Sequence, residues 1–517
     1  MKYFLFLFLT FLFSVSVGAQ KLLLDFPIAD VHVHAAMRGY NISLQRKSTI
    51  WEFIENDCSG KISSLFKLAS REVPKYTQSN LESMISSSNR LSFLSLVPLE
   101  REMLTARLLN EEKKGGPTMA CISGLENMKM YETEGKVDYF KDLMQNLKWV
   151  ENQANLDENI NGILYRFDLI ENKKQLVENL SNPAKISLIL NAEGGHVLGY
   201  ALDRKSDFTD AKHQEYYFNN LLYIKGAKAN AEGNFFKYAF FSMNINHFFW
   251  NGLSGHARTF TTAQNIIFGG GEGVDEGLTD FGQKVIRLML DKNQGRRILV
   301  DIKHMSLDAR KWYYQYIDSM AVLGDTIPVF SSHSTVSGLS MQSSSYLEKD
   351  NAKKNRKSIL NQWTISLANE DISQIVQTKG LLGLMLDKYK LCGKRGKKLM
   401  KETIPGTIQR RKVNLKIILA NIFSAVKAHG KKEVWNHIAI GSDFDGMIVP
   451  FETYANSAQL DDLAQDLYQF LSKPAPIFDL FTEEELKKLM FGLTAEQIVK
   501  KIMSENAIAF TLRNLPD

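Results

Sequence analysis

Cysteine and proline are both scarce in this 517-residue chain, which contains 3 Cys and 11 Pro. Three thiols cannot form a disulfide framework, and their spacing fits no cysteine-based zinc motif. Any metal site must therefore rest on histidine and carboxylate side chains. The low proline content and the 44% share of hydrophobic residues exclude a collagen-like or disordered chain, because ample apolar surface is present for a packed core.

A strong excess of one charge is also absent. The 63 Lys and Arg exceed the 57 Asp and Glu by only 6, whereas a nucleic-acid-binding protein usually carries a larger basic excess on one face. We therefore expect no nucleic-acid partner. Length alone suggests about three domains, but one decorated α/β barrel can use the same number of residues.

Long apolar runs are missing beyond the N-terminus. Residues 1–19 combine Lys2, an apolar stretch and the small residues Val17-Gly18-Ala19 before a polar Gln20, which is typical of a cleaved secretory signal peptide. The alternative is an uncleaved membrane anchor, although the run is shorter than the roughly 20 residues that span a bilayer. We expect residues 20–517 to form one exported domain, periplasmic or secreted, with no transmembrane span.

Short apolar segments alternate with amphipathic stretches along the rest of the chain. Most of these segments are continuously apolar, as in parallel strands that are covered on both faces. Strand and helix in alternation, eight times over, predict a (β/α)₈ TIM barrel. The expected strands are 26–34, 117–124, 186–193, 239–246, 297–303, 327–332, 380–386 and 437–442.

Two connections are much longer than the others, near 35–115 and 388–412. Because long structureless loops are uncommon in compact domains, we expect these insertions to contain helices. The segment 388–412 carries ten basic residues. It follows the seventh strand and could overhang the site, where it would attract anionic substrates; the alternative is a solvated surface loop.

Histidine or carboxylate residues end six of the eight predicted strands. A barrel of this class builds its chemistry from the C-terminal ends of its strands. Residues two apart on a strand face the same side, so the first strand can aim two imidazoles at one point. The candidate site residues are His32, His34, Glu193, His247, His304, His333 and Asp443.

This residue set has a definite metal chemistry. Imidazole and carboxylate without thiolate suit Zn²⁺, with Mn²⁺ or Fe²⁺ as alternatives. Four histidines and a bridging acid are too many ligands for one tetrahedral ion, but they suffice for two divalent ions with a hydroxide between them. Such a pair activates water near neutral pH and polarises a carbonyl group, and a nearby acid can pass the proton to a leaving amine.

In this order the motifs resemble the renal (membrane) dipeptidase family of metallopeptidases, within the metal-dependent amidohydrolase superfamily. The similarity runs from about residue 26 to about residue 446. The motifs that carry it are Asp30-Val31-His32-Val33-His34, Glu193-Gly194-Gly195, Asn246-His247 with Asn251-Gly252, Gly277-Leu278-Thr279 with Phe281-Gly282, Asp301 with His304 and Ser306, Ser332-His333-Ser334, and Gly441 with Asp443-Phe444-Asp445-Gly446.

The resemblance implies a role for each ligand candidate. His32 and His34 would hold the first metal ion, and His304 and His333 would hold the second. Glu193 would bridge the two ions.

The resemblance also implies the remaining roles. Asp443 would be the general acid/base, and His247 would contact the substrate carbonyl and stabilise its oxyanion. The hydroxide would attack the peptide carbonyl of a short substrate. The family resemblance also implies a possible homodimer.

This chain departs from the family pattern in two places: the first ligand motif and the residue that binds the substrate. Many family members have His-x-Asp where this chain has His32-Val33-His34, which raises the charge of the site by one. Family dipeptidases also carry an Arg shortly after the second-metal histidine, and it binds the terminal carboxylate of the substrate. Residues 334–350 contain no Arg, so Arg356 is the remaining candidate for this contact.

These observations predict a dinuclear metallohydrolase that cleaves the amide bond of a dipeptide or a similarly small amide. Hydrolysis of a lactone or a cyclic amide on the same metal ions is the alternative reaction. A non-catalytic envelope binding protein, which docks through its basic segment, is the alternative from another class. The acid at Asp443 argues against it, since a binding protein needs no general acid.

Overall fold

The computed structural model describes most of the chain after residue 24. The predicted signal peptide at 1–19 and the substrate-contact candidate Arg356 both lie outside the described residues. The described residues are 25–44, 46–56, 72–104, 121–124, 138–154, 156–201, 208–260, 271–343, 346 and 357–517.

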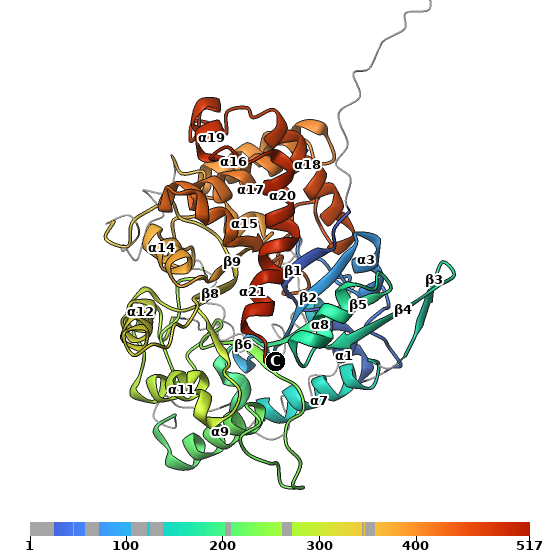
Figure 1. The fold of residues 1–517 in the computed structure, drawn as a ribbon, viewed down its shortest axis with the longest axis vertical. Helices are drawn as coiled ribbons and strands as arrows, with labels where there is room; N and C mark the ends of the chain where they lie inside the picture. The colour runs from blue at the N-terminus through green and yellow to red at the C-terminus, as the bar shows by residue number, and fades with distance from the viewer. Residues whose placement is uncertain are drawn as a thin grey trace, which may run out of the picture.

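Parallel strands form a closed barrel in the centre of the molecule (Figure 1). Its eight strands within the described residues are β1 (Ile28–Val33), β2 (Asn89–Leu96), β5 (Lys185–Ala192), β6 (Phe240–Asn244), β7 (Leu299–Asp301), β8 (Phe330–Ser334), β9 (Leu381–Leu384) and β10 (Ile438–Ile440). β1 pairs with β2, β2 pairs with β5, and each later strand pairs with the next until β10 pairs with β1. The predicted (β/α)₈ barrel is confirmed.

Helices surround the barrel and fill its connections (Figure 1). They are α1 (Met37–Ser43), α3 (Leu81–Ser86), α4 (Arg101–Leu104), α7 (Tyr139–Glu151), α8 (Lys173–Leu180), α9 (Ala211–Ile224), α11 (Asp280–Leu290), α12 (Leu307–Val322), α14 (Asn369–Gln377), α15 (Lys388–Leu391), α16 (Lys394–Lys401), α17 (Ile408–His429), α18 (Leu460–Ser472), α19 (Glu483–Leu489), α20 (Ala495–Lys500) and α21 (Asn506–Asn514). Of the helices in the described ranges, none has both the length and the apolar character that a membrane crossing requires.

The helix α11 illustrates how the sequence produces this outer layer. Its buried residues include Phe281, Val285 and Met289, and this spacing of four places them on one face of a helix. The side chain of Thr279 accepts a hydrogen bond from the backbone N–H of Gly282 and caps the first turn. The apolar face therefore packs against the barrel, and the polar cap sets where the helix begins.

The C-terminal helix α21 closes one end of the barrel. Figure 1 shows α20 and α21 crossing in front of the strands. The ring of Phe510 lies 5.7 Å from that of Phe241 and 5.1 Å from that of Phe330, between ring centroids. Phe241 is the second residue of β6 and Phe330 is the first residue of β8, so α21 covers the N-terminal end and leaves the opposite end for chemistry.

The position of the second barrel strand was predicted wrongly. That strand is β2, inside the expected insertion at 35–115, and not 117–124; of the latter segment, residues 121–123 are helical. The polar residues Ser92 and Ser95 interrupt the apolar run of β2 and hide its strand character. Leu91 and Phe93 nevertheless belong to the apolar cluster inside the barrel.

A hairpin that was not predicted extends the sheet beside β5. It consists of β3 (Glu158–Ile160) and β4 (Ile163–Leu169), and β4 pairs with the first half of β5. The connecting residues Asn161 and Gly162 have φ values of 53° and 85°. An Asn-Gly pair tolerates these values and is the usual signal for a two-residue hairpin turn.

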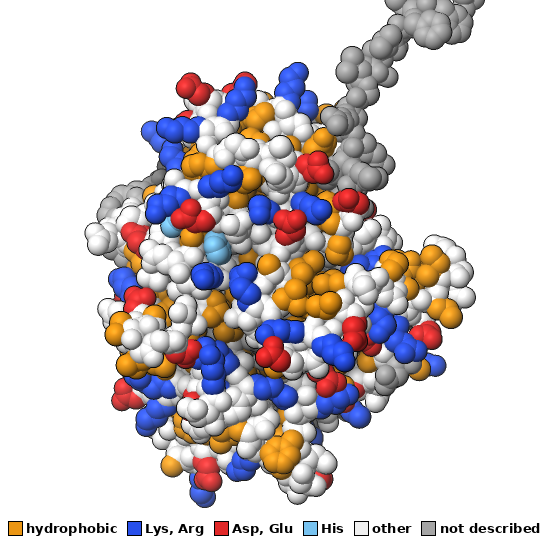
Figure 2. All heavy atoms as spheres, in the orientation of Figure 1, with side chains coloured by type: hydrophobic (Ala, Val, Ile, Leu, Met, Phe, Trp, Pro, Cys, Tyr) orange, Lys and Arg blue, Asp and Glu red, His pale blue; other side chains and the backbone are white. Residues whose placement is uncertain are grey.

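The basic segment 388–412 contains α15, α16 and the start of α17. On the face that Figure 2 shows, Lys and Arg side chains are scattered among acidic and apolar ones. Positive charge therefore does not gather into one patch on that face.

Candidate metal centre

The seven candidate residues converge at the C-terminal end of the barrel, opposite α21. His32 and His333 lie within β1 and β8, and the others follow within three residues of the ends of β1, β5, β6, β7 and β10. Each residue exposes 7% or less of its surface. The convergent set is His32, His34, Glu193, His247, His304, His333 and Asp443.

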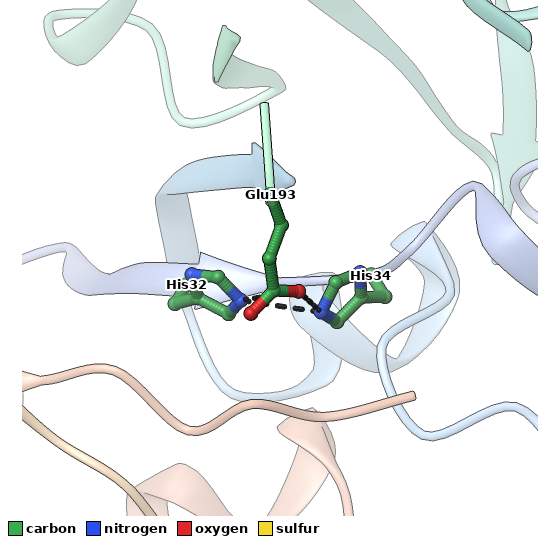
Figure 3. Close-up of side chains that lie close together, drawn as sticks. All are labelled: His32, His34 and Glu193. Carbon is green, nitrogen blue, oxygen red and sulfur yellow. Dashed lines mark hydrogen bonds and ion pairs between the residues drawn. The ribbon is translucent and has the colours of Figure 1, made fainter. Parts of the chain in front are cut away.

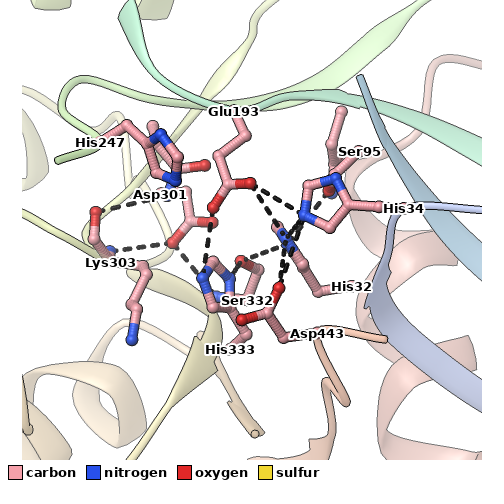
Figure 4. Close-up of polar contacts among 12 residues, drawn as sticks. His32, His34, Ser95, Glu193, His247, Asp301, Lys303, Ser332, His333 and Asp443 are labelled. Atoms are coloured by element: carbon pink, nitrogen blue, oxygen red, sulfur yellow. Dashed lines mark hydrogen bonds and ion pairs between the residues drawn. The ribbon is translucent and has the colours of Figure 1, made fainter. Parts of the chain in front are cut away.

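Glu193 stands at the middle of this set and faces two pairs of imidazoles; Figure 3 shows the pair of His32 and His34, and Figure 4 adds His333. Its Oε2 atom lies 2.9 Å from His34 Nε2 and 3.6 Å from His32 Nε2. Its Oε1 atom lies 3.3 Å from both His304 Nε2 and His333 Nε2. The two oxygens of one carboxylate therefore serve two separate groups of nitrogen atoms.

Within each pair the imidazole nitrogens are close neighbours. The Nε2 atoms of His32 and His34 are 3.2 Å apart, and those of His304 and His333 are 3.3 Å apart. A neutral imidazole has one nitrogen that accepts and one that donates. These nitrogens and the carboxylate are a buried donor set of the kind that can hold a metal ion.

Hydroxyl groups hold two of the rings in this orientation. Ser332 Oγ lies 2.9 Å from His32 Nδ1 and 2.8 Å from His333 Nδ1, and Ser95 Oγ lies 3.0 Å from His32 Nδ1 (Figure 4). A partner on the outer nitrogen fixes the ring and directs the other nitrogen to the centre. In the described chain, His34 Nδ1 and His304 Nδ1 are buried with no such partner.

Irregular backbone aims several of these side chains. The strand register shifts between Asp30 and Val33 in β1 and between Ser331 and Ser334 in β8, and a bulge re-aims side chains at the rim of a barrel. His304 and Asp443 have φ values of 69° and 64°. Backbone of this kind is strained in a residue with a side chain and concentrates at functional sites.

Two buried carboxylates brace the strand ends without entering the centre. Asp30 Oδ1 accepts hydrogen bonds from the backbone N–H of His32 and of Ser442. Asp301 Oδ1 accepts from Lys303 and Ser332 (Figure 4). Each carboxylate thus ties the end of one strand to its neighbour and limits movement of the candidate ligand residues.

The electrostatics of the centre favour neutral imidazoles at His304 and His333 and a protonated imidazole at His34, beside an ionised Glu193. Burial lowers the pKa values of His304 and His333 well below the ordinary range. Burial acts to raise the pKa of Glu193, but the surrounding imidazoles outweigh it, and that pKa is held well below its usual value. For His34, burial acts to lower the pKa, but Glu193 and Asp443 outweigh it and raise the pKa to about 10. Neutral nitrogen and anionic oxygen are the donor types that Zn²⁺ prefers in proteins.

Asp443 lies beside the first imidazole pair. Its Oδ1 atom is 3.5 Å from His34 Nε2 and 3.9 Å from His32 Nε2. Burial raises the pKa of its carboxyl group. This carboxylate is therefore close to the ligand atoms and less acidic than an exposed one.

Glu100 is a site residue that the sequence analysis missed. Its Oε2 atom lies 2.7 Å from His247 Nδ1, and its two oxygens accept backbone N–H groups from Phe248 and Phe249. Glu100 follows β2 by four residues, so the wrong position of that strand concealed it. A carboxylate shortly after a correctly placed strand end is the signal that would have revealed it.

A small cavity adjoins the centre between His34, Glu193 and His247. Its volume is about 10 Å³, and its apolar lining includes Met37 and Met447. A cavity of this size has room for about one water molecule. Water can thus lie directly beside the candidate ligands.

Comparison with known proteins gives a match of fold. No protein-family model and no curated protein sequence matches the chain. A dipeptidase AC, described as a metallopeptidase of family M19, is 15% identical with a TM-score of 0.50, over 95% of this chain and 99% of its own. A Rhodobacter sphaeroides metallopeptidase, liganded with a phosphinate mimic of the dipeptide L-Ala-D-Ala, is 15% identical with a TM-score of 0.48, over 95% and 99%.

A third structure, the probable dipeptidase PvdM from Pseudomonas aeruginosa, is 12% identical with a TM-score of 0.45, over 95% of this chain and 96% of its own. The family indicated by the sequence motifs is thus also the family of the first of these structures. At such low identity, what this chain shares with the first structure is the (β/α)₈ fold.

Proposed function

We propose that this chain is a dinuclear metal-dependent hydrolase that cleaves the amide bond of a dipeptide or a similarly small amide. One observation carries the proposal: each oxygen of Glu193 faces its own pair of histidine nitrogens. A structural carboxylate in a barrel core has no need of four imidazoles. Two divalent ions that share one bridging carboxylate account for all of them.

The donor atoms divide into two ligand groups. His32 and His34 would bind one ion, His304 and His333 would bind the other, and Glu193 would bridge them. The nitrogen and oxygen donor set favours Zn²⁺. When bound, such ions act as Lewis acids toward a carbonyl group and lower the pKa of water.

Asp443 is suited to move the proton in this reaction. Its carboxylate lies within 3.5 Å of His34 Nε2, at the edge of the space that the attacking water would occupy. It would accept the proton of that water and return it to the nitrogen of the leaving amine.

His247 would stabilise the negative charge that develops on the substrate carbonyl oxygen. Burial acts to lower the pKa of its ring, but Glu100 and Glu193 outweigh it, so that pKa is raised. With Nδ1 held by Glu100, a protonated ring directs the N–H at Nε2 toward the centre. A fixed donor of this kind is an effective part of an oxyanion site.

We further propose that the protein is exported to the periplasm or secreted. The signal-peptide pattern at 1–19 is the first support. The second is that Cys121 is disulfide-bonded, since disulfides persist mainly in oxidising compartments.

Hydrolysis of a lactone or a cyclic amide is the second candidate reaction. The observation in its favour is that residues 334–350 contain no Arg, whereas the family pattern places a carboxylate-binding Arg there. A substrate without a terminal carboxylate would not require that residue.

Elemental analysis of the mature protein, combined with assays on dipeptides and lactones, tests the proposal. We expect two ions per chain and turnover of dipeptides. Two ions with turnover of lactones alone would replace the first reaction by the second. Protein without bound transition metal and without turnover would contradict both reactions.

A further inference from the structure

Two aromatic rings beside the candidate metal centre have no part in the chemistry described so far. Phe248 directly follows His247, and its ring centroid lies 3.8 Å from that of His247 and 5.1 Å from that of His304. The ring of Phe260 lies 5.2 Å from that of Phe248, between centroids. We refer to Phe248 and Phe260 together as the aromatic wall.

Both residues of the aromatic wall keep part of their surface accessible, whereas the neighbouring site residues are almost fully buried. Phe248 and Phe260 are partly exposed, while His304 exposes 4% and His247 exposes 6% of its surface. Phe249, the next residue in the chain, is buried and exposes 4%. Accessible apolar surface directly beside a few polar groups is the usual composition of a small-molecule binding site.

Backbone contacts to the site hold both parts of the aromatic wall in place. The N–H of Phe248 donates to Glu100 Oε2 at 3.3 Å, so the carboxylate that orients the candidate oxyanion donor also fixes this residue. On the other segment, the N–H of Ala257 donates to the carbonyl oxygen of His304 at 2.7 Å, three residues before Phe260. A surface that is already ordered loses little conformational freedom when a ligand binds to it.

The aromatic wall stands on one side of Glu193, and Asp443 stands on the other. His304, against which Phe248 packs, faces Glu193 Oε1. Asp443 lies beside His34, which faces Oε2 (Figure 4). Under the proposed function Asp443 passes its proton to the leaving amine. The leaving amine therefore points away from the aromatic wall, and the acyl component of the substrate points toward it.

The space on the side of His34 is too small for a bulky side chain. The small cavity described above, which His34 and Met447 help to line, has a volume of about 10 Å³ and holds about one water molecule. A phenyl ring on the amine component would not fit into it. The partly exposed rings of the aromatic wall impose no such limit on the acyl component.

We propose that Phe248 and Phe260 form the surface that binds an apolar or aromatic side chain on the acyl component of the substrate. The substrate class is then a dipeptide whose first residue is apolar or aromatic and whose second residue is small, or a small amide with a similar acyl group. Aromatic rings pack against one another at centroid separations of about 4.5–7 Å, and the wall offers two rings for such a contact. This assignment rests on the proposed amide hydrolysis.

Two isomeric dipeptides test the aromatic wall directly. Phenylalanyl-glycine and glycyl-phenylalanine contain the same two residues and differ in which one belongs to the acyl component. Extra apolar groups that a binding site buries change kcat/KM by about 10-fold or more. The protein should therefore prefer phenylalanyl-glycine by about that factor over both glycyl-phenylalanine and alanyl-glycine. A preference for glycyl-phenylalanine, or equal kcat/KM values for phenylalanyl-glycine and alanyl-glycine, would overturn the inference.

Phe248→Ala should abolish the preference for phenylalanyl-glycine over alanyl-glycine, because the phenyl ring of the substrate loses its contact. A merely structural role of Phe248 would lower both kcat/KM values equally and leave their ratio unchanged, and that result would overturn the inference. Phe248→Tyr should retain the preference, since the aromatic ring is kept.

Phe235→Ala is the matched control, because Phe235 precedes β6 and is 63% exposed. Its ratio of kcat/KM values should equal that of the unmodified protein. If Phe248→Ala fails to fold, Phe260→Ala decides: an unchanged ratio in that variant would also overturn the inference.

Calorimetry separates this inference from the proposed reaction. Metal-loaded Asp443→Asn should bind phenylalanyl-glycine about 10-fold or more tightly than alanyl-glycine, and the double variant with Phe248→Ala should bind both equally. Selective binding without turnover of either dipeptide by the unmodified protein would retain the aromatic wall and refute the dipeptidase proposal. Equal binding of the two dipeptides by Asp443→Asn would refute the aromatic wall, whatever the turnover.

Discussion

The Nδ1 atom of His247 lies 2.7 Å from Glu100 Oε2, although 147 residues separate the two in sequence. Glu100 follows β2, and His247 follows β6, so the contact joins the ends of two barrel strands that are not neighbours. The carboxylate also accepts backbone N–H groups of Phe248 and Phe249. It therefore fixes both the ring of His247 and the turn that presents it.

Glu100→Gln should impair catalysis without removing metal. The amide keeps the size of the side chain but loses the charge that favours a doubly protonated ring. Loss of a supporting partner typically costs about 10- to 100-fold, which we expect to appear in kcat, with the metal content unchanged. Glu102→Gln, two residues later in α4, is the control and should retain normal kcat. A fall in metal content in Glu100→Gln would instead indicate a ligand role.

Asp443→Asn should retain its metal ions and lose turnover. The amide cannot accept the proton of the attacking water, and general acid/base groups contribute about 10²- to 10⁴-fold. Steady-state kinetics and elemental analysis of the same sample check both parts. Undiminished kcat would remove Asp443 from the mechanism.

His304→Ala should lower the metal content toward one ion per chain. The substitution removes one of the two nitrogens that face Glu193 Oε1, while the pair at Oε2 stays intact. His429→Ala is the control, since His429 lies at the end of α17 and pairs with Glu433. Two ions per chain in His304→Ala would show that the ligand assignment is wrong.

Phe510→Ala should destabilise the barrel without changing the chemistry of the centre. Its ring fills the closed end between Phe241 and Phe330, and truncation of a buried Phe costs about 3–5 kcal/mol. Chemical denaturation measures the loss. Leu512→Ala, at a partly buried position of the same helix, should cost clearly less. An equal cost for both would argue against α21 as the closure of the barrel.

The sequence predicted the site best where a histidine or carboxylate stands at the end of a regular apolar strand segment. His32 and Glu193 could be placed because each sits at the end of an apolar run, and a barrel brings such ends together. Ser95 and Glu100 could not be found, because polar serines broke the pattern of β2. Ser95 forms a hydrogen bond with His32 Nδ1, so this polar residue has a structural role inside the strand.

The sequence also contains a local turn signal from which the hairpin of β3 and β4 could have been predicted. The pair Asn161-Gly162 predicts the turn that joins β3 and β4. The contact between Glu100 and His247 has no comparable signal, because 147 residues separate the two in sequence and only the closure of the barrel brings them together. Long-range charge arrangements of this kind depend on the tertiary structure.

The left-handed backbone at His304 and Asp443 has a consequence for how the protein would respond to selection. Each residue occupies a conformation that costs an L-amino acid roughly 1–2 kcal/mol, and glycine would relieve that cost. Asp443→Gly should therefore melt at a higher temperature than the unmodified protein while it loses turnover. A screen for thermal stability alone would therefore favour variants that have lost their activity. A screen for stabilised variants must also select for turnover.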